Sequence, residues 1–347
     1  MSGVQKIIVA DDDTDQRLDR WLRRLFPHVS QGRIEKMCRK GDLRVDGGRV
    51  KSSTRVMAGQ TVRVPPLPAS DLRPNDTQRR ISEADIKMIQ SCVIYRDDHV
   101  IALNKPHGLA VQGGSGQSRH VDGLAAALCF ELDEKPKLVH RLDKDTSGVL
   151  LLARTRMAAQ ALTAAFRHRE TRKIYWAVVA GVPHPKSGMI KTGLVKAHGH
   201  GPGGEGEKMY NIHPRDIDDT PGAKKAVTDY SLLEAAGKRA AWMALSPVTG
   251  RTHQLRAHMG ELGHPIVGDG KYGGSGQENL GDGWGSQLGD EISKKLHLHA
   301  RSIKIQHPEN KSVLHITAPL PKHMQDTWDY FQWDPREVPE DPFEEEE

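Results

Sequence analysis

The sequence predicts an α+β protein of two domains, a small one over residues 14–64 and a large one over residues 91–325. A chain of 347 residues is long enough for two domains and a large hydrophobic core. Apolar residues recur at helical spacing early in the chain, whereas later they form short runs bounded by turn residues, a pattern typical of strands. Residues 65–90 open with three prolines in four positions and continue as a polar run, so we expect a linker there.

The composition excludes several classes of protein. Hydrophobic residues make up 37% of the chain, and no apolar run approaches the roughly 20 residues that span a membrane. Residues 1–13 contain no apolar segment of the secretory kind, and three consecutive aspartates argue against a transit peptide. Cys38, Cys92 and Cys129 lie far apart and form no C-x-x-C motif, which favours a reducing compartment. We expect a cytoplasmic protein that does not contact membranes.

The charge is distributed unevenly along the chain. Residues 14–64 contain thirteen lysines and arginines against five acids, a net charge of +8, although the whole chain carries only +5. A basic block of this kind indicates a polyanionic partner, because a solvated surface usually mixes both signs. Residues 334–347 contain eight acids and one arginine. We expect an acidic C-terminal tail over residues 326–347, disordered after Asp334.

The small domain is expected to contain two helices, a hairpin and a further strand. Thr14 is the predicted N-cap of the first helix, and the second helix runs from about Ser30 to a C-terminal stop at Gly41. Residues 46–48, Asp-Gly-Gly, have the composition of a hairpin turn, and residues 62–64 read as a strand.

Two basic helices followed by a strand–turn pattern resemble the alpha-L RNA-binding module, which is named for ribosomal protein S-four. The resemblance implies that the second helix and the turn after it face RNA. The side chains that it assigns to RNA binding are Arg33, Lys36, Arg39, Lys40 and Arg44.

The large domain is expected to open with a hairpin and to continue mainly as strands. The hairpin strands are residues 93–95 and 100–103. A helix is predicted over residues 157–167, and strands over residues 149–153, 173–181, 225–230 and 242–245. The Gly-rich residues 198–220 are expected to form a surface loop.

One polar stretch stands directly before a buried strand, which is a usual way to fix a carboxylate at the rim of a sheet. Residues 140–148 read His-Arg-Leu-Asp-Lys-Asp-Thr-Ser-Gly. They resemble the catalytic signature of the RluA-type pseudouridine synthases, His-Arg-Leu-Asp-x-x-Thr-Ser-Gly. Residues 104–108 and 250–258 resemble two further segments of that family, Asn-Lys-Pro-x-Gly and Gly-Arg-Thr-His-Gln-x-Arg-x-His. The resemblance runs through several motifs in the right order, from about Val93 to Pro308.

The resemblance implies a largely antiparallel mixed sheet and an enzyme that isomerises uridine in RNA to pseudouridine. It makes Asp143 the catalytic carboxylate, Tyr175 the ring that lies against the uracil, and Arg251 the cation that pairs with Asp143 and keeps it ionised. Arg141 would reach RNA and fill the space that the flipped base leaves. Large-subunit ribosomal RNA is the expected partner, with an RluC-like assignment preferred to an RluD-like one, and the protein is expected to be a monomer without a cofactor.

Several alternatives stay open at the level of sequence. Period-two alternation alone favours Tyr175 as a core residue, and a purely structural ion pair would give Arg251 the same geometry. Asp143 could attack the sugar, add to the base or abstract a sugar proton. The rival functions are an RNA N-glycosidase and a non-catalytic RNA-binding ribosome-assembly protein.

Other motifs carry less weight. Gly268, Gly270 and Gly273 have the spacing of a dinucleotide-binding loop but lack a strand before them and a helix after them. His253 and His258 are five residues apart instead of four, and no His-Glu-x-x-His motif occurs, so we expect no metal and no nucleotide cofactor. Asp145, a variable position of the family signature, is assigned a loop role.

Overall fold

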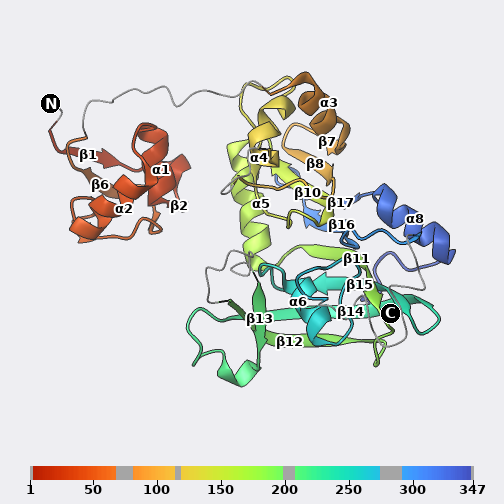
Figure 1. Cartoon of the computed structure of the whole chain (residues 1–347). Coiled ribbons are helices and arrows are strands. Elements are labelled where there is room, and N and C mark those ends of the chain that lie inside the picture. Colours follow the sequence, from red (N-terminus) through yellow and green to blue (C-terminus); the bar gives the residue numbers. More distant parts are fainter. Residues whose placement is uncertain (1–2, 68–80, 114–118, 198–207, 274–290, 345–347) are drawn as a thin grey trace. The chain divides into compact units, whose positions relative to one another are not determined.

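The computed structural model describes residues 3–67, 81–113, 119–197, 208–273 and 291–344 (Figure 1). The chain divides into two compact units, Met1–Arg80 and Ile81–Glu347, here called the N-terminal and C-terminal units. The division falls inside the expected linker, of which residues 68–80 lie outside the described part. Residues expected as its end form instead the helix α3 (Glu83–Ser91), whose Ile89 is fully buried in a core of the C-terminal unit.

The N-terminal unit packs two helices against short strands. Its elements are β1 (Gln5–Ile8), β2 (Gln16–Arg17), α1 (Leu18–Leu25), α2 (Gln31–Lys40), β3 (Arg44–Val45), β4 (Gly48–Arg49), β5 (Arg55–Val56) and β6 (Thr61–Val64). The expected hairpin is present as β3 and β4. The unit begins earlier than residue 14, because β1 pairs antiparallel with β6.

The two helices have different N-terminal ends. Ser30 caps α2, its hydroxyl accepting a hydrogen bond from the Arg33 amide at 3.4 Å, and Gly41 ends the helix with φ of 77°. Both predictions are confirmed. The prediction that Thr14 caps α1 is wrong, because the helix begins after Arg17 without a side-chain cap. The Thr14 hydroxyl instead accepts the Ala58 amide at 3.2 Å.

The C-terminal unit is built on an eleven-stranded sheet with the path β13-β12-β14-β15-β11-β16-β10-β8-β7, to which β9 and β17 are added at β10 and β16. Its strands are β7 (Val93–Arg96), β8 (Val100–Lys105), β9 (Lys137–Leu138), β10 (Ser147–Ala153), β11 (Arg172–Ala180), β12 (Ser187–Lys196), β13 (Met209–Ile212), β14 (Lys224–Ala236), β15 (Ala240–Pro247), β16 (Leu298–Gln306) and β17 (Val313–Thr317). The α-helices described in this unit, besides α3, are α4 (Val121–Leu124), α5 (Arg156–His168), α6 (Gln254–Glu261) and α8 (Lys322–Phe331). Among the described strands only β10 and β16 pair in parallel, so the expected largely antiparallel mixed sheet is confirmed.

Alternate residues of the central strands enter different cores, as period two requires. Leu150 and Leu152 of β10 pack with α3 and α4, whereas Val149 and Leu151 pack with α5. Both faces of β10 are therefore buried, which explains its unbroken apolar run.

Two loop predictions need correction. The predicted surface loop over residues 198–220 contains the strand β13, which pairs with β12, and a 3-10 helix at Pro214–Asp216. Its residues 198–207 lie outside the described part. The prediction of disorder after Asp334 is wrong for the described residues 335–344. Phe343 packs into the core cluster around Trp328, next to Trp333, and Arg172 donates two hydrogen bonds of 2.8 Å to Asp341. Residues 345–347 lie outside the described part. The prediction rested on the number of acidic residues in this segment and did not weigh its aromatic residues, which supply the buried apolar area.

Candidate active site

The segment that carries Asp143 enters the sheet where β10 and β16 begin their parallel pairing. Gly148 makes this entry with φ of 106°, and a Cβ atom there would lie 2.2 Å from the Ala300 carbonyl oxygen. Only glycine fits such a position. Ser147 bonds His299 Nδ1 at 2.9 Å, so the end of the loop that bears Asp143 is fixed to β16.

A buried lysine braces the same loop from the neighbouring strand. Lys105, which ends β8 and has no exposed surface, donates hydrogen bonds to the carbonyl oxygens of Pro106, Leu109 and Lys144 at 2.8 to 3.0 Å. Burial lowers the pKa of Lys105 to about 7, whereas three carbonyl acceptors favour the ammonium, which alone has three protons to give. The Asn-Lys-Pro motif alone did not indicate this role of Lys105.

A cavity of about 530 Å³ opens over this loop. Its lining brings together the loop, the end of α5, the start of β11 and the chain that leads into α6. Among the lining residues are His140, Arg141, Asp143, Phe166, Arg167, Arg169, Lys173, Tyr175, Arg251, His253 and Arg256. The three predicted catalytic residues therefore lie around one cavity.

The Asp143 carboxylate is 28% exposed and has two nitrogen neighbours at ion-pair distance. His253 Nε2 lies 3.9 Å and Arg256 Nη1 lies 4.0 Å from Oδ2. Both approach the same oxygen. No hydrogen bond or ion pair within the described chain involves Oδ1, which leaves that oxygen available to a substrate.

The arginine beside Asp143 is not the one expected. Arg251 Nε donates to the Lys225 carbonyl at 3.1 Å and lies outside ion-pair distance of Asp143, so that prediction is corrected to Arg256. Arg251 precedes α6 on a loop, whereas Arg256 is buried within the helix. The signal was present in the sequence, since the second arginine of the Gly-Arg-Thr-His-Gln-x-Arg segment is Arg256.

Arg256 is held rigidly by a second carboxylate. Its Nε and Nη2 each donate to the fully buried Asp269 at 2.7 Å. Burial alone would lower the pKa of Arg256, but the bonds to Asp269 and the nearby Asp143 charge raise it overall. The guanidinium is a fixed positive charge beside Asp143.

Tyr175 lines the cavity from β11, at a position where the pairing with β16 is irregular. Burial and the Asp143 charge both raise the pKa of this phenol, so it stays protonated at neutral pH. The predicted alternation of β11 is confirmed, because Ile174 and Trp176 pack into a different cluster from Ala177 and Val179.

Exposed cations surround the mouth of the cavity. Arg141 is exposed as expected, and Arg167 and Arg169 were not predicted. Burial, followed by the Arg169 charge, lowers the pKa of Lys173 to about 8. A positively charged mouth suits a phosphate backbone.

The five basic residues predicted to bind RNA in the N-terminal unit are not equivalent. Arg33, Lys36, Arg39 and Lys40 are exposed along α2. Arg44 instead turns its guanidinium onto the backbone, donating to the Gly41 and Gly47 carbonyls at 3.0 and 3.1 Å. It therefore braces the hairpin turn.

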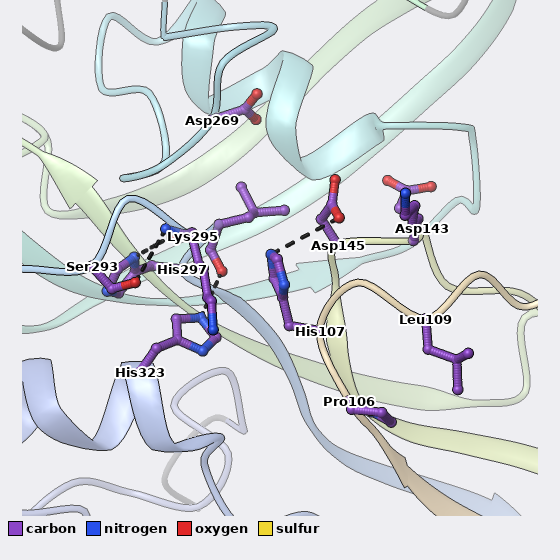
Figure 2. Close-up of polar contacts among 12 residues, drawn as sticks. Pro106, His107, Leu109, Asp143, Asp145, Asp269, Ser293, Lys295, His297 and His323 are labelled. Atoms are coloured by element: carbon purple, nitrogen blue, oxygen red, sulfur yellow. Dashed lines mark hydrogen bonds and ion pairs between the residues drawn. The ribbon is translucent and has the colours of Figure 1, made fainter. Parts of the chain in front are cut away.

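Asp145 has the loop role that was expected. Figure 2 shows the His107 ring directed toward Asp145, with Nε2 3.9 Å from Oδ1. His107 packs edge-on against His323, which packs against His297. Neither these residues nor others in the described ranges form a group of three or more ligands placed to hold a metal ion.

Comparison with known proteins decides the family. Residues 99–261 match the model of RNA pseudouridylate synthase, and residues 16–62 match that of the S4 domain. Ribosomal large subunit pseudouridine synthase C of Vibrio cholerae serotype O1 is 34% identical over 325 residues, which cover 93% of this chain and 95% of that protein. The chain belongs to the RNA pseudouridylate synthase family.

Further relatives of this RNA pseudouridine synthase agree with the assignment. RNA pseudouridine synthase 4, mitochondrial, of Arabidopsis thaliana is 34% identical over 394 residues, covering 94% of this chain and 81% of that protein. The solved structure of human RNA pseudouridylate synthase domain containing 4 has a TM-score of 0.55 at 28% identity, and covers 71% of this chain and 95% of its own. The predicted family, isomerase class and S4-type module are confirmed. None of the described helices is long and apolar enough to span a membrane.

Proposed function

We propose that this synthase isomerises specific uridines of large-subunit ribosomal RNA, with Asp143 as its catalytic carboxylate. The observation that carries the proposal is the asymmetric setting of Asp143, whose Oδ2 faces Arg256 and His253 while Oδ1 is left to the substrate. The name of the Vibrio cholerae relative supports the choice of RNA.

The reaction breaks an N-glycosidic bond, turns the base and rejoins it through carbon five. No change of oxidation state is involved. The C5–C1′ bond replaces the N1–C1′ bond, the hydrogen on carbon five leaves to solvent as a proton, and N1 takes up a proton, so substrate and product have the same composition. A carboxylate suits the sugar part of this reaction because it serves as a nucleophile or stabilises an oxocarbenium-like centre. Tyr175 lies on the wall of the same cavity and is assigned to the face of the uracil.

The substrate uridine has to leave its stack, at a cost of a few kcal/mol. Arg141, exposed at the cavity, is assigned to the RNA from which the base is withdrawn. Phosphate contacts of Arg33, Lys36, Arg39 and Lys40 offset the cost without reading sequence. We assign the protein to the cytoplasm because its three cysteines are free thiols, and we propose that it acts as a monomer.

The test is tritium release from large-subunit ribosomal RNA that contains uridine labelled at carbon five. Wild-type protein should release tritium without free uracil, and Asp143→Ala should release none while binding the RNA as tightly as wild type. Free uracil would replace the proposal by an N-glycosidase. Salt-sensitive binding without any release would replace it by an assembly protein.

A further inference from the structure

His253 stands in a backbone conformation that L-residues rarely adopt. It precedes α6 with φ of 52° and ψ of 19°, in the left-handed region, and makes no side-chain cap for the helix. Such conformations cost free energy and are over-represented at functional sites, although turns and helix ends of this chain also contain them, as at Arg169 and Gln332. The imidazole is buried and lies against the carboxylate of Asp143.

The contact of His253 with a tyrosine is the basis for assigning its proton to one of the two ring nitrogens. Tyr272 Oη lies 3.1 Å from His253 Nδ1 and also accepts the Met209 amide at 2.8 Å. Since the amide already donates to the phenol oxygen, we assign the phenol proton as the donor to Nδ1. Burial lowers the pKa of His253, which favours the neutral ring. With Nδ1 assigned as the acceptor of the phenol proton, the single N–H is assigned to Nε2.

That N–H faces Asp143, whose Oδ2 lies 3.9 Å away. Tyr272 is itself fixed, because Asp269 accepts its backbone amide at 3.2 Å and also holds Arg256. Asp269 and Tyr272 thus support both of the groups that approach Oδ2. Asp269 and Tyr272 therefore act on the Asp143 carboxylate indirectly, through Arg256 in α6 and through His253 at the N-terminus of that helix.

We propose that His253 is a positioning residue for Asp143, with its Nε2–H directed at Oδ2 by the hydrogen bond from Tyr272. Together with Arg256, it keeps Oδ2 turned away from the ribose and presents Oδ1 to it. This inference rests on the proposed catalytic role of Asp143. In this arrangement Asp143 has a neutral N–H donor, His253, beside the fixed positive charge of Arg256.

Two replacements of His253 separate its contacts. The Asn side chain places a polar atom at the position of Nδ1, accepts the bond from Tyr272 and tolerates the left-handed backbone, but does not reach Asp143. The Gln side chain places an N–H at the position of Nε2, but gives up the bond to Tyr272. A merely structural His253 is therefore better replaced by Asn, whereas a positioning His253 is better replaced by Gln.

The experiment measures single-turnover tritium release at saturating large-subunit ribosomal RNA, together with RNA affinity and melting temperature. His253→Asn should lose about 100-fold in rate, as expected for a misplaced reacting group, with RNA affinity and melting temperature close to wild type. His253→Gln should lose only about tenfold. A rate for Asn equal to or above that for Gln would overturn the proposal.

A double-mutant cycle tests whether Tyr272 acts through His253. Tyr272→Phe alone should lower the rate about tenfold, and should lower it no further in the His253→Asn background. Tyr210→Phe, on the exposed Tyr210 of β13, is the matched control and should leave the rate unchanged. Additive losses would overturn the proposed coupling. Absence of release by the wild-type protein would instead reject the proposed function, so the two failures are distinguishable.

Discussion

The two units of this synthase place their polar groups in opposite ways. Among the described residues the N-terminal unit buries only two polar or charged side chains, Asp13 and Asp19, whereas the C-terminal unit buries twenty. The C-terminal unit is little more than three times as long. Binding of a phosphate backbone needs charged side chains on the surface, and a domain with a small core can present them. The reaction needs polar groups held in fixed positions, and these depend on a larger core.

The largest expected difference between the units is their response to acid. His258, His297 and His299 are fully buried, and burial lowers the pKa of His258 to about 4 and those of His297 and His299 to about 3. Below pH 6.5 these three histidines become protonated in the unfolded chain but stay neutral in the folded unit. Each histidine therefore costs about 1.4 kcal/mol of unfolding free energy per pH unit as the pH falls toward 4.

Native-state hydrogen exchange between pH 6.5 and 4.5 reports each unit separately. Protection of β10, β11 and β16 should fall steeply across this range. The amides of α2 should lose little, because His28 is the one histidine of the N-terminal unit and is exposed. Equal slopes in the two units would contradict the contrast.

The next effect concerns the brace under the catalytic loop. Lys105→Met keeps the length of the side chain but leaves three carbonyl groups without their donor, although Lys144 still accepts the Gly108 amide. We expect a loss of about 3 kcal/mol of unfolding free energy, measured by urea denaturation, and slower tritium release. Lys137→Met, at an exposed ion pair with Glu134, is the matched control and should change stability by less than about 1 kcal/mol. Equal losses of unfolding free energy in the two variants would show that Lys105 does not stabilise the loop.

A smaller effect is expected within the basic block, on RNA affinity. Arg39→Ala should weaken binding to large-subunit ribosomal RNA and reduce the salt slope by about 0.7 to 0.9, as for one lost phosphate contact. Arg44→Ala should leave the slope nearly unchanged and destabilise the N-terminal unit instead, because its guanidinium is bonded to Gly41 and Gly47. Binding titrations at several salt concentrations distinguish them. An equal change of slope would mean that both side chains contact phosphate.

The same contrast explains what the sequence could and could not predict. Local patterns predicted α2 between Ser30 and Gly41, the alternation of β11 and the loop that carries Asp143, because each depends on neighbouring residues. The pairing of Asp143 with Arg256 depends on how α6 and β10 meet across a hundred residues of chain. Periodicity carries no information on such contacts. The Gly-Arg-Thr-His-Gln-x-Arg segment was therefore recognised, but Arg251 was chosen in place of Arg256 as the partner of Asp143.

The smallest predicted effect tests the helix ends of the N-terminal unit. Ser30→Ala removes a hydroxyl that caps α2 and should cost about 1 kcal/mol of stability in that unit. Thr14→Ala, the residue that the sequence suggested as a cap, should cost less than about 0.5 kcal/mol, because Thr14 lies outside α1 and bonds an exposed turn. Hydrogen exchange of the α1 and α2 amides measures both changes in the full chain. A larger loss from Thr14→Ala would restore Thr14 as a residue that determines where the first helix forms.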